Sequence, residues 1–179
     1  MHHPRSVVYA DRWADVRGRC IFGNEANRVY LNQGDYFVDV AEQVGLTRTG
    51  TSRGVALADF DNDGDLDVLI THMTAPPSLY RNDSQAAAWL GLDLVGNSRS
   101  CNRDALGTKV TLLPAHGGHA QHREVYANNG LAAQGDRRLL FGLGTDTAST
   151  ARLSIRWCGR GEPQTVELDT GHYHRIQQP

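Results

Sequence analysis

The stretch ADFDNDGDLDVLITHM, residues 58–73, carries five aspartates at alternate positions: Asp59, Asp61, Asp63, Asp65 and Asp67. The chain has fifteen aspartates, so a third of them lie in this one run. Neighbouring carboxylates repel one another, and no basic residue interrupts the run. A bound hard cation with oxygen ligands would remove that repulsion.

The spacing D-x-D-x-D-G-x-x-D assigns the ligands of a calcium loop. Asp59, Asp61 and Asp63 hold loop positions 1, 3 and 5, and Asp67 holds position 9. Asp65 at position 7 is expected to offer its backbone carbonyl and to direct its side chain outward. Calcium is favoured over magnesium because several protein carboxylates converge, whereas magnesium keeps more of its waters. The alternative, a solvated acidic hairpin without an ion, stays open.

The flanks of the loop exclude an EF-hand. That motif needs a glutamate at position 12 and a helix on each side, but Ile70 stands at position 12. The flanking segments GVALA and DVLITHM are apolar and β-branched, without helical periodicity. Gly64 at position 6 permits the positive φ of a sharp turn. The sequence therefore predicts strand–loop–strand, with an ion that holds the loop and no catalytic residue.

A second, altered copy of this pattern precedes the first. A shift of 48 residues lays VVYADRWADVRGRCIFG over VALADFDNDGDLDVLIT, so that Asp11 and Asp15 correspond to Asp59 and Asp63. Arg19 stands where the later copy has its ninth-position aspartate. We therefore expect that the first copy has lost its ion, with Arg19 supplying positive charge. A period near 50 residues is typical of propeller blades of four short strands, although unrelated hairpins with chance matches remain an alternative.

After NDSQAAA, residues 82–88, the pattern changes to short alternating strands separated by glycine- and asparagine-rich turns. The segments WLGLDLV, TKVTLL, REVYA, RLLFGLG, ARLSIRW and QTVEL predict six or seven strands. The apolar residues expected on core-facing positions are Leu90, Leu92, Leu94, Val110, Leu112, Leu153, Ile155 and Trp157. This spacing favours a small antiparallel sandwich or barrel.

Two resemblances support this division. The residues GVALADFDNDGDLDVLI and LYRND resemble the FG-GAP/VCBS repeat, the calcium-loop blade of integrin-type propellers. The residues NRDALGTKVTL, QHREVYANNG, RLLFGLG, LSIRW and HYHRIQ resemble the ASPIC/UnbV domain, and this order is that of the cartilage acidic protein family. The resemblances imply an all-β chain, with two propeller-type blades in residues 1–86 forming an incomplete propeller. A small antiparallel β-sandwich or barrel would follow in residues 87–179.

The composition of the chain limits the classes of partner and the compartments that we expect. The net charge of −2 argues against nucleic acid, and no apolar run is long enough to span a membrane. The start of the sequence lacks the apolar region of a secretory signal, so the chain as written is expected to be cytoplasmic, or extracellular or periplasmic if its N-terminus is truncated. Seventeen arginines against the single Lys109 suggest a GC-rich bacterial genome. Cys20, Cys101 and Cys158 allow one bridge at most, and free thiols are favoured.

The histidines and arginine pairs give weaker signals. HGGHAQH holds His116, His119 and His122, and HYH holds His172 and His174. Both motifs predict exposed or structural side chains, with a transition-metal site in HGGHAQH as the alternative. Ion pairs or a ligand rim are expected at Arg103-Asp104, Arg123-Glu124 and Arg137-Arg138.

The function that these observations favour is a calcium-binding, non-catalytic interaction module with calcium as its only cofactor. The partner would be an unidentified protein or carbohydrate, and exposed blade edges would permit self-association. Two alternatives stay open: an accessory enzyme, such as a cyclase, in a bacterial natural-product pathway, and the C-terminal remnant of a longer propeller protein. No serine–histidine–aspartate set or phosphate-binding glycine loop can be assigned.

Overall fold

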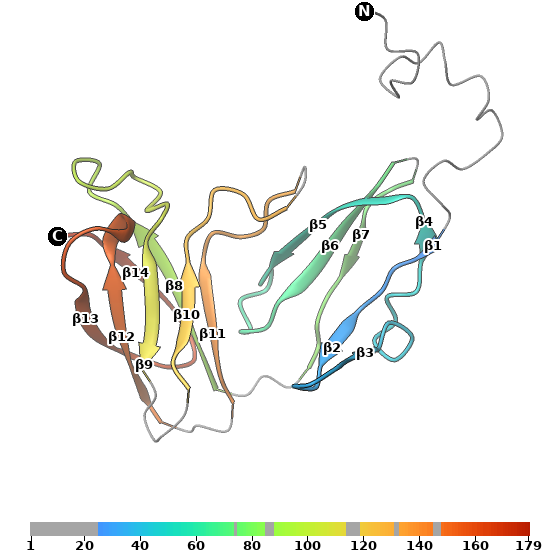
Figure 1. Cartoon of the computed structure of the whole chain (residues 1–179), viewed down its shortest axis with the longest axis horizontal. Coiled ribbons are helices and arrows are strands. Elements are labelled where there is room, and N and C mark those ends of the chain that lie inside the picture. Colours follow the sequence, from blue (N-terminus) through green and yellow to red (C-terminus); the bar gives the residue numbers. More distant parts are fainter. Residues whose placement is uncertain (1–24, 74, 85–87, 114–118, 131–132, 145–147) are drawn as a thin grey trace, which may run out of the picture. The chain divides into compact units, whose positions relative to one another are not determined.

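The computed structural model describes residues 25–73, 75–84, 88–113, 119–130, 133–144 and 148–179. Within these ranges the chain is nearly all β, and its several small sheets stay open (Figure 1). The expected all-β class is therefore confirmed. No helix in the described ranges is long and apolar enough to cross a membrane. The earlier copy of the loop, with Asp11, Asp15, Arg19 and Cys20, lies outside the described residues.

Fourteen strands are defined within the described ranges. The first seven are β1 (Glu25–Ala26), β2 (Tyr30–Asn32), β3 (Phe37–Asp39), β4 (Thr49–Gly50), β5 (Ser52–Ala58), β6 (Asp67–His72) and β7 (Ser78–Tyr80). The others are β8 (Ala88–Val95), β9 (Lys109–Leu113), β10 (Gln121–Glu124), β11 (Leu139–Gly144), β12 (Thr150–Arg156), β13 (Gln164–Asp169) and β14 (Tyr173–Gln177). A short 3-10 turn, Trp157–Gly159, follows β12.

The chain forms two compact units. One unit comprises residues 1–53 with 72–76, and the other comprises residues 54–71 with 77–179. The aspartate hairpin, residues 54–71, therefore belongs to the same unit as the C-terminal strands. The sequence boundary between residues 86 and 87 stays a prediction.

The first unit is held by two short antiparallel pairs, β1 with β4 and β2 with β3. Arg28 and Asp39 form an ion pair with 2.7 Å between Nη1 and Oδ2. The Arg28 hydrogen bond, together with a hydrogen bond from the Ala41 amide, lowers the pKa of the Asp39 carboxyl. Three aromatic side chains here stay largely exposed, Tyr30, Tyr36 and Phe37. Two-stranded hairpins are marginally stable alone, so local polar contacts of this kind matter for the unit.

In the second unit, β5, β6 and β7 form a three-stranded sheet in that order. β6 pairs antiparallel with β7, so that Val68 lies opposite Tyr80. The predicted strand–loop–strand arrangement is confirmed, because β5 ends at Ala58 and β6 begins at Asp67.

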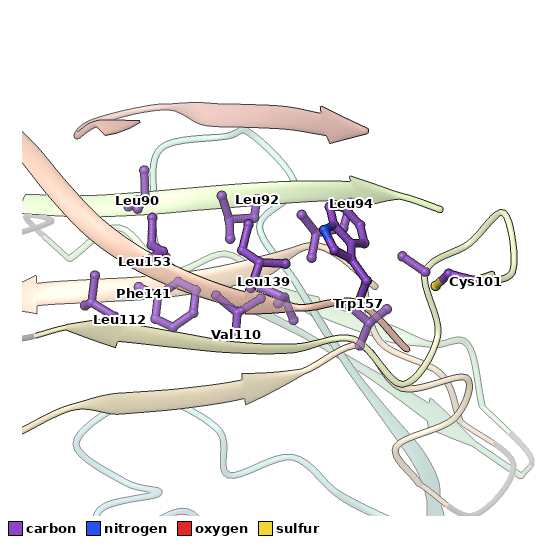
Figure 2. Packing of buried hydrophobic residues seen from close by; sticks show 13 residues of the cluster. Leu90, Leu92, Leu94, Cys101, Val110, Leu112, Leu139, Phe141, Leu153 and Trp157 are labelled. Atoms are coloured by element: carbon purple, nitrogen blue, oxygen red, sulfur yellow. The ribbon is translucent and has the colours of Figure 1, made fainter. Parts of the chain in front are cut away.

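The C-terminal strands form two further sheets, β10-β9-β12-β13 and β11-β8-β14. The core contains alternate residues of the strands, as Figure 2 shows for Leu90, Leu92 and Leu94 of β8. Its buried residues are Leu90, Leu92, Leu94, Cys101, Ala105, Val110, Leu112, Val125, Leu139, Phe141, Leu153, Ile155 and Trp157. The core positions expected from the alternation are all confirmed. Each large apolar side chain buried here contributes about 1.5–3 kcal/mol.

One strand pairing differs from the expected antiparallel arrangement. β14 pairs parallel with β8, with Tyr173 opposite Gly91 and Gln177 opposite Val95. These strands lie at the two ends of the C-terminal part of the chain, so no hairpin joins them. Parallel neighbours need a long connection rather than a tight turn, and here the whole intervening domain provides it.

The expectation of free thiols is wrong for two of the three cysteines. Cys101 and Cys158 form a disulfide with 5.5 Å between their Cα atoms, within the usual range for such bonds. Thr108, which is buried, accepts a hydrogen bond from the Cys158 amide at 3.0 Å. The two cysteines are separated by 57 residues, and only the folding of β8 and β12 into one domain brings them together.

Candidate metal centre

The aspartate loop turns sharply between β5 and β6. Gly64 has φ +95° and Asn62 has φ 61°, both in the left-handed region. The predicted positive φ at Gly64 is confirmed. The glycine has a second role, because a Cβ on Gly64 would overlap the indole ring of Trp89. A side chain at this position would thus be disfavoured both by the backbone conformation and by the packing.

Three of the predicted ligands converge. One carboxylate oxygen each from Asp59, Asp61 and Asp67 lies within 4.8 Å of the others. Asp59 and Asp67 are only 1% exposed, whereas Asp61 is exposed. Two oxygens that bind one calcium ion from opposite sides lie about 5 Å apart. The three carboxylates are therefore close enough together to hold a single cation.

The two buried carboxylates are oriented by backbone donors. Asp59 accepts hydrogen bonds from the amides of Asp63 at 3.2 Å and Gly64 at 3.0 Å. Asp67 accepts from the amides of Phe60 and Asn82, both at 2.8 Å. A carboxylate has about four lone-pair positions, so these bonds fix the side chains and still leave oxygen capacity for a cation.

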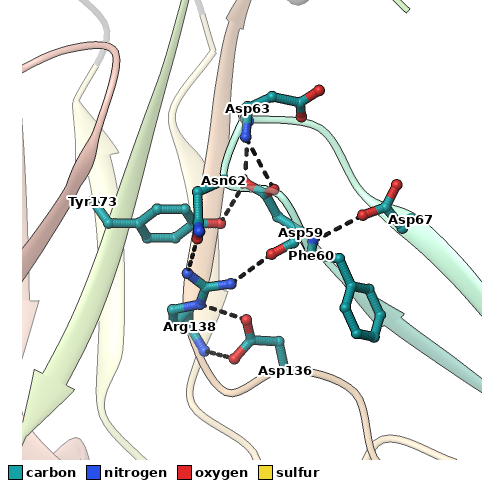
Figure 3. Close-up of polar contacts among 9 residues, drawn as sticks. Asp59, Phe60, Asn62, Asp63, Asp67, Asp136, Arg138 and Tyr173 are labelled. Carbon is teal, nitrogen blue, oxygen red and sulfur yellow. Dashed lines mark hydrogen bonds and ion pairs between the residues drawn. The ribbon is translucent and has the colours of Figure 1, made fainter. Parts of the chain in front are cut away.

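The other two aspartates lie outside this cluster. Asp63 accepts a hydrogen bond from the Asp65 amide at 3.1 Å, and Figure 3 shows its carboxylate directed away from Asp59. The Asp65 side chain lies outside the cluster, as expected, but it is half-buried. Its Oδ2 accepts from the Ser84 hydroxyl at 3.2 Å, and its Oδ1 is buried without a hydrogen-bond partner among the described residues. Burial raises the pKa of the Asp65 carboxyl; the Ser84 bond opposes this shift and the neighbouring carboxylates reinforce it.

Ion pairs do not neutralise the loop. The ion pairs of the described residues involve acids elsewhere, and none includes an aspartate of the 59–67 loop. The nearby guanidinium of Arg138 instead contacts neutral oxygens: its Nη2 donates to the Asp59 backbone carbonyl at 2.7 Å, and its Nη1 donates to Asn62 Oδ1. The two buried carboxylates have hydrogen-bond donors but no ion pair among the described residues, so a bound cation would lower the repulsion between them.

Two residues from distant segments of the chain hydrogen-bond to the loop, and sequence reasoning did not assign either of them to the site. Tyr173 of β14 donates its hydroxyl to Asp59 Oδ2 at 2.9 Å (Figure 3). Arg138 lies over the Tyr173 ring, with 4.1 Å from Cζ to the ring centroid, and is itself held by the Asp136 carboxylate. Burial, followed by the Asp59 hydrogen bond, raises the pKa of Tyr173. The Asp136 amide also donates to the Leu57 carbonyl at 2.8 Å.

The arginine pairs behave differently from one another. Arg103 lies 3.4 Å and Arg137 lies 3.0 Å from the Asp104 carboxylate, so the expected pairing is confirmed there. Arg123 instead lies over the Phe141 ring, with 5.5 Å from Cζ to the centroid. Glu124, its neighbour in sequence, lies 3.9 Å from the ammonium of Lys109.

The histidines form no metal cluster within the described residues, where the aspartates supply the one candidate group. The HGGHAQH segment does connect a hairpin, β9 with β10, as expected. His122 Nδ1 lies 3.0 Å from the Thr111 hydroxyl, and His116 lies outside the described residues. The His172 and His174 rings stack with 4.2 Å between centroids.

Two protein-family models match the chain, one in each part. A model of the FG-GAP-like repeat matches residues 8–70, which include both copies of the aspartate pattern. A model of the ASPIC and UnbV domain matches residues 98–179, beginning after β8. A comparison with curated proteins gave no match. The two domains together suggest a β-propeller-type interaction module. The chain thus joins an FG-GAP-like repeat to an ASPIC and UnbV domain.

Proposed function

We propose that the 59–67 loop binds one calcium ion and that the chain acts as a calcium-stabilised, non-catalytic interaction module. The observation that carries the proposal is the cluster of Asp59, Asp61 and Asp67, with oxygens within 4.8 Å of one another and two of the three side chains buried. An all-oxygen, multiply charged donor set is what calcium prefers. The Asp63 carboxylate and the Asp65 backbone carbonyl are the remaining expected ligands.

The role of the ion would be structural. Asp59 directly follows β5 and Asp67 begins β6, so an ion shared by both would hold the two strands at their junction. Asp59 is also bound by Tyr173 and, through its backbone carbonyl, by Arg138. Calcium would therefore stabilise both the hairpin and its attachment to the strands of the ASPIC and UnbV domain. The partner, protein or carbohydrate, and the alternatives of an accessory enzyme or a propeller remnant stay predictions.

Thermal unfolding in calcium and in a chelator tests this proposal. A ligand that binds only the native state stabilises it by about 2.7 kcal/mol at a hundredfold excess over its dissociation constant. We expect a gain of this order for the wild-type chain in millimolar calcium. Equal melting temperatures in calcium and in chelator would contradict the proposal.

Asp61→Asn is the most informative variant. The Asp61 carboxylate is exposed and accepts no hydrogen bond from the described residues, so its replacement removes charge without removing a native contact. We expect the variant to lose the calcium effect and to be slightly more stable than wild type in chelator, because carboxylate repulsion decreases. Asp83→Asn removes the same charge outside the cluster, from a residue paired with Arg81. This control should keep the full calcium effect.

A further inference from the structure

A cavity of about 670 Å³ lies along β9, β10 and β12 and does not include the aspartate loop. Strand residues line one part of it. Residues that follow β10 line another part: Tyr126, Asn128, Asn129, Gln134, Gly135, Asp136 and Arg137. Its volume falls within the range of small-molecule sites, about 300–1,000 Å³. The cavity can therefore hold a ligand of one or two sugar rings.

Positive charge predominates in this cavity. Four cationic side chains line it, against two carboxylates; the cations are Lys109, Arg123, Arg137 and Arg156. Both carboxylates already have cationic neighbours. Asp136 binds Arg138, and Glu124 lies 3.9 Å from Lys109. Arg137 lies 3.0 Å from Asp104, outside the cavity, so Arg123 and Arg156 are the lining cations without an ion pair among the described residues. An anionic ligand would be attracted to this positive charge.

Two of the cations face each other directly. Lys109 lies opposite Arg156 in the β9–β12 register, and both side chains are exposed. Like charges at directly opposed positions destabilise a sheet. Arg156 makes no ion pair with any residue in the part of the chain that the structure describes. A carboxylate placed between the two side chains would convert this repulsion into two favourable contacts.

The rest of the lining suits a ligand rich in hydroxyl groups. Asn128 and Asn129 each use the side-chain carbonyl to accept a backbone amide, from Gly130 at 3.0 Å and Gly135 at 2.9 Å, which leaves their NH₂ groups as donors. Tyr126 is 57% exposed and offers a flat apolar ring with a polar tip. The C–H face of a pyranose ring can pack against such a surface while its hydroxyls bind the amides.

We infer that this cavity binds a hexuronate, either free or as a unit of an acidic saccharide. The carboxylate would lie between Lys109 and Arg156, and the sugar ring would lie toward Tyr126 and the two asparagines. The inference deepens the proposed interaction function by naming a partner class. It does not depend on calcium, because the cavity lining includes none of the loop aspartates.

Calorimetric titration of the whole chain tests the inference. Galacturonate and digalacturonate should bind, whereas neutral galactose should not, because the carboxylate supplies the main interaction. Tighter binding of digalacturonate would indicate a polymer unit, and equal binding would indicate the free sugar acid. Arg156→Gln should weaken binding about tenfold or more, as expected for loss of a charged hydrogen bond. Lys109→Gln should weaken binding by a similar factor. It provides a second test of the site if Arg156→Gln folds poorly.

Arg152→Gln is the matched control, because Arg152 is an exposed arginine of the same strand that does not line the cavity. It should leave binding unchanged. Three results would each overturn the inference. The chain could fail to bind galacturonate, Arg152→Gln could weaken binding as much as Arg156→Gln, or acetate could bind as tightly as galacturonate. Repeating the titration in a chelator separates the two proposals: galacturonate binding that persists without calcium supports the cavity even if calcium fails to stabilise the chain.

Discussion

The Tyr173 hydroxyl donates a hydrogen bond to the buried carboxylate of Asp59, with 2.9 Å between Oη and Oδ2. The two residues are 114 positions apart in sequence, one in the last strand and the other at the first position of the aspartate loop. A hydrogen bond to an ionised acceptor is stronger than one between neutral groups. The last strand therefore orients the residue on which the candidate metal centre depends most.

Tyr173→Phe removes this hydrogen bond and keeps the ring that packs against Trp89 and Arg138. We expect a loss of about 1–3 kcal/mol in the free energy of unfolding, because the buried Asp59 carboxylate loses one of its three donors. Urea unfolding measures this loss. Tyr30→Phe is the control, since Tyr30 is 60% exposed and should change stability by less than about 0.5 kcal/mol. Equal effects of the two substitutions would show that the hydrogen bond contributes nothing.

Gly64→Ala should destabilise the chain for two reasons, its positive φ and the overlap of the new Cβ with Trp89. Gly171→Ala isolates the first reason, because Gly171 also has a positive φ but has no neighbour within 4 Å of a Cβ. We expect the control to cost about 1 kcal/mol. The Gly64 variant should cost about 1–3 kcal/mol more, as overpacking usually does. Chemical denaturation measures the free energy of unfolding of both variants. Equal losses would show that the contact with Trp89 does not restrict the side chain at position 64.

Local patterns predicted much of the fold. The apolar alternation of Leu90, Leu92 and Leu94 required one buried strand face, because side chains alternate along a strand. The spacing of the aspartates predicted a loop between two strands and a glycine with positive φ. Each of these signals lies within about ten residues of sequence.

Contacts between distant segments were not predicted. Tyr173 lies in β14 and Arg138 directly precedes β11, and no local sequence pattern marks either residue as a contact of the loop. The Cys101–Cys158 disulfide and the parallel pairing of β14 with β8 likewise depend on how the sheets assemble. A single sequence carries periodicity along the chain, but it does not record which strands become neighbours.

Reduction of the disulfide should destabilise the native state. The loop that Cys101 and Cys158 close has 57 residues, for which the chain-entropy estimate is about 4 kcal/mol. We expect a lower melting temperature in reductant for the wild type. The Cys101→Ser/Cys158→Ser double variant should melt at one low temperature in both conditions. Three titratable thiols in the unfolded, unreduced protein would contradict the bond.

The Arg28–Asp39 pair predicts a local dependence on pH. The pKa of Asp39 is lowered in the folded state, mainly by its hydrogen bond with Arg28, so the unfolded chain binds the proton more tightly. The contribution to stability is therefore present above about pH 4, the ordinary value for aspartate, and is lost as the pH falls through the folded pKa. Asp39→Asn should make stability less sensitive to pH over this range. An unchanged acid dependence would show that the exposed pair has no effect.

Calorimetric titration of the chelator-treated chain with calcium tests the central claim most directly. The account predicts one bound calcium per chain for the wild type and for Asp83→Asn, and loss of that binding in Asp61→Asn. Stoichiometry of one would also agree with the expected loss of the ion from the earlier copy of the loop. Absence of binding at millimolar calcium, or identical binding by wild type and Asp61→Asn, would contradict the assignment of the aspartate cluster as a calcium site.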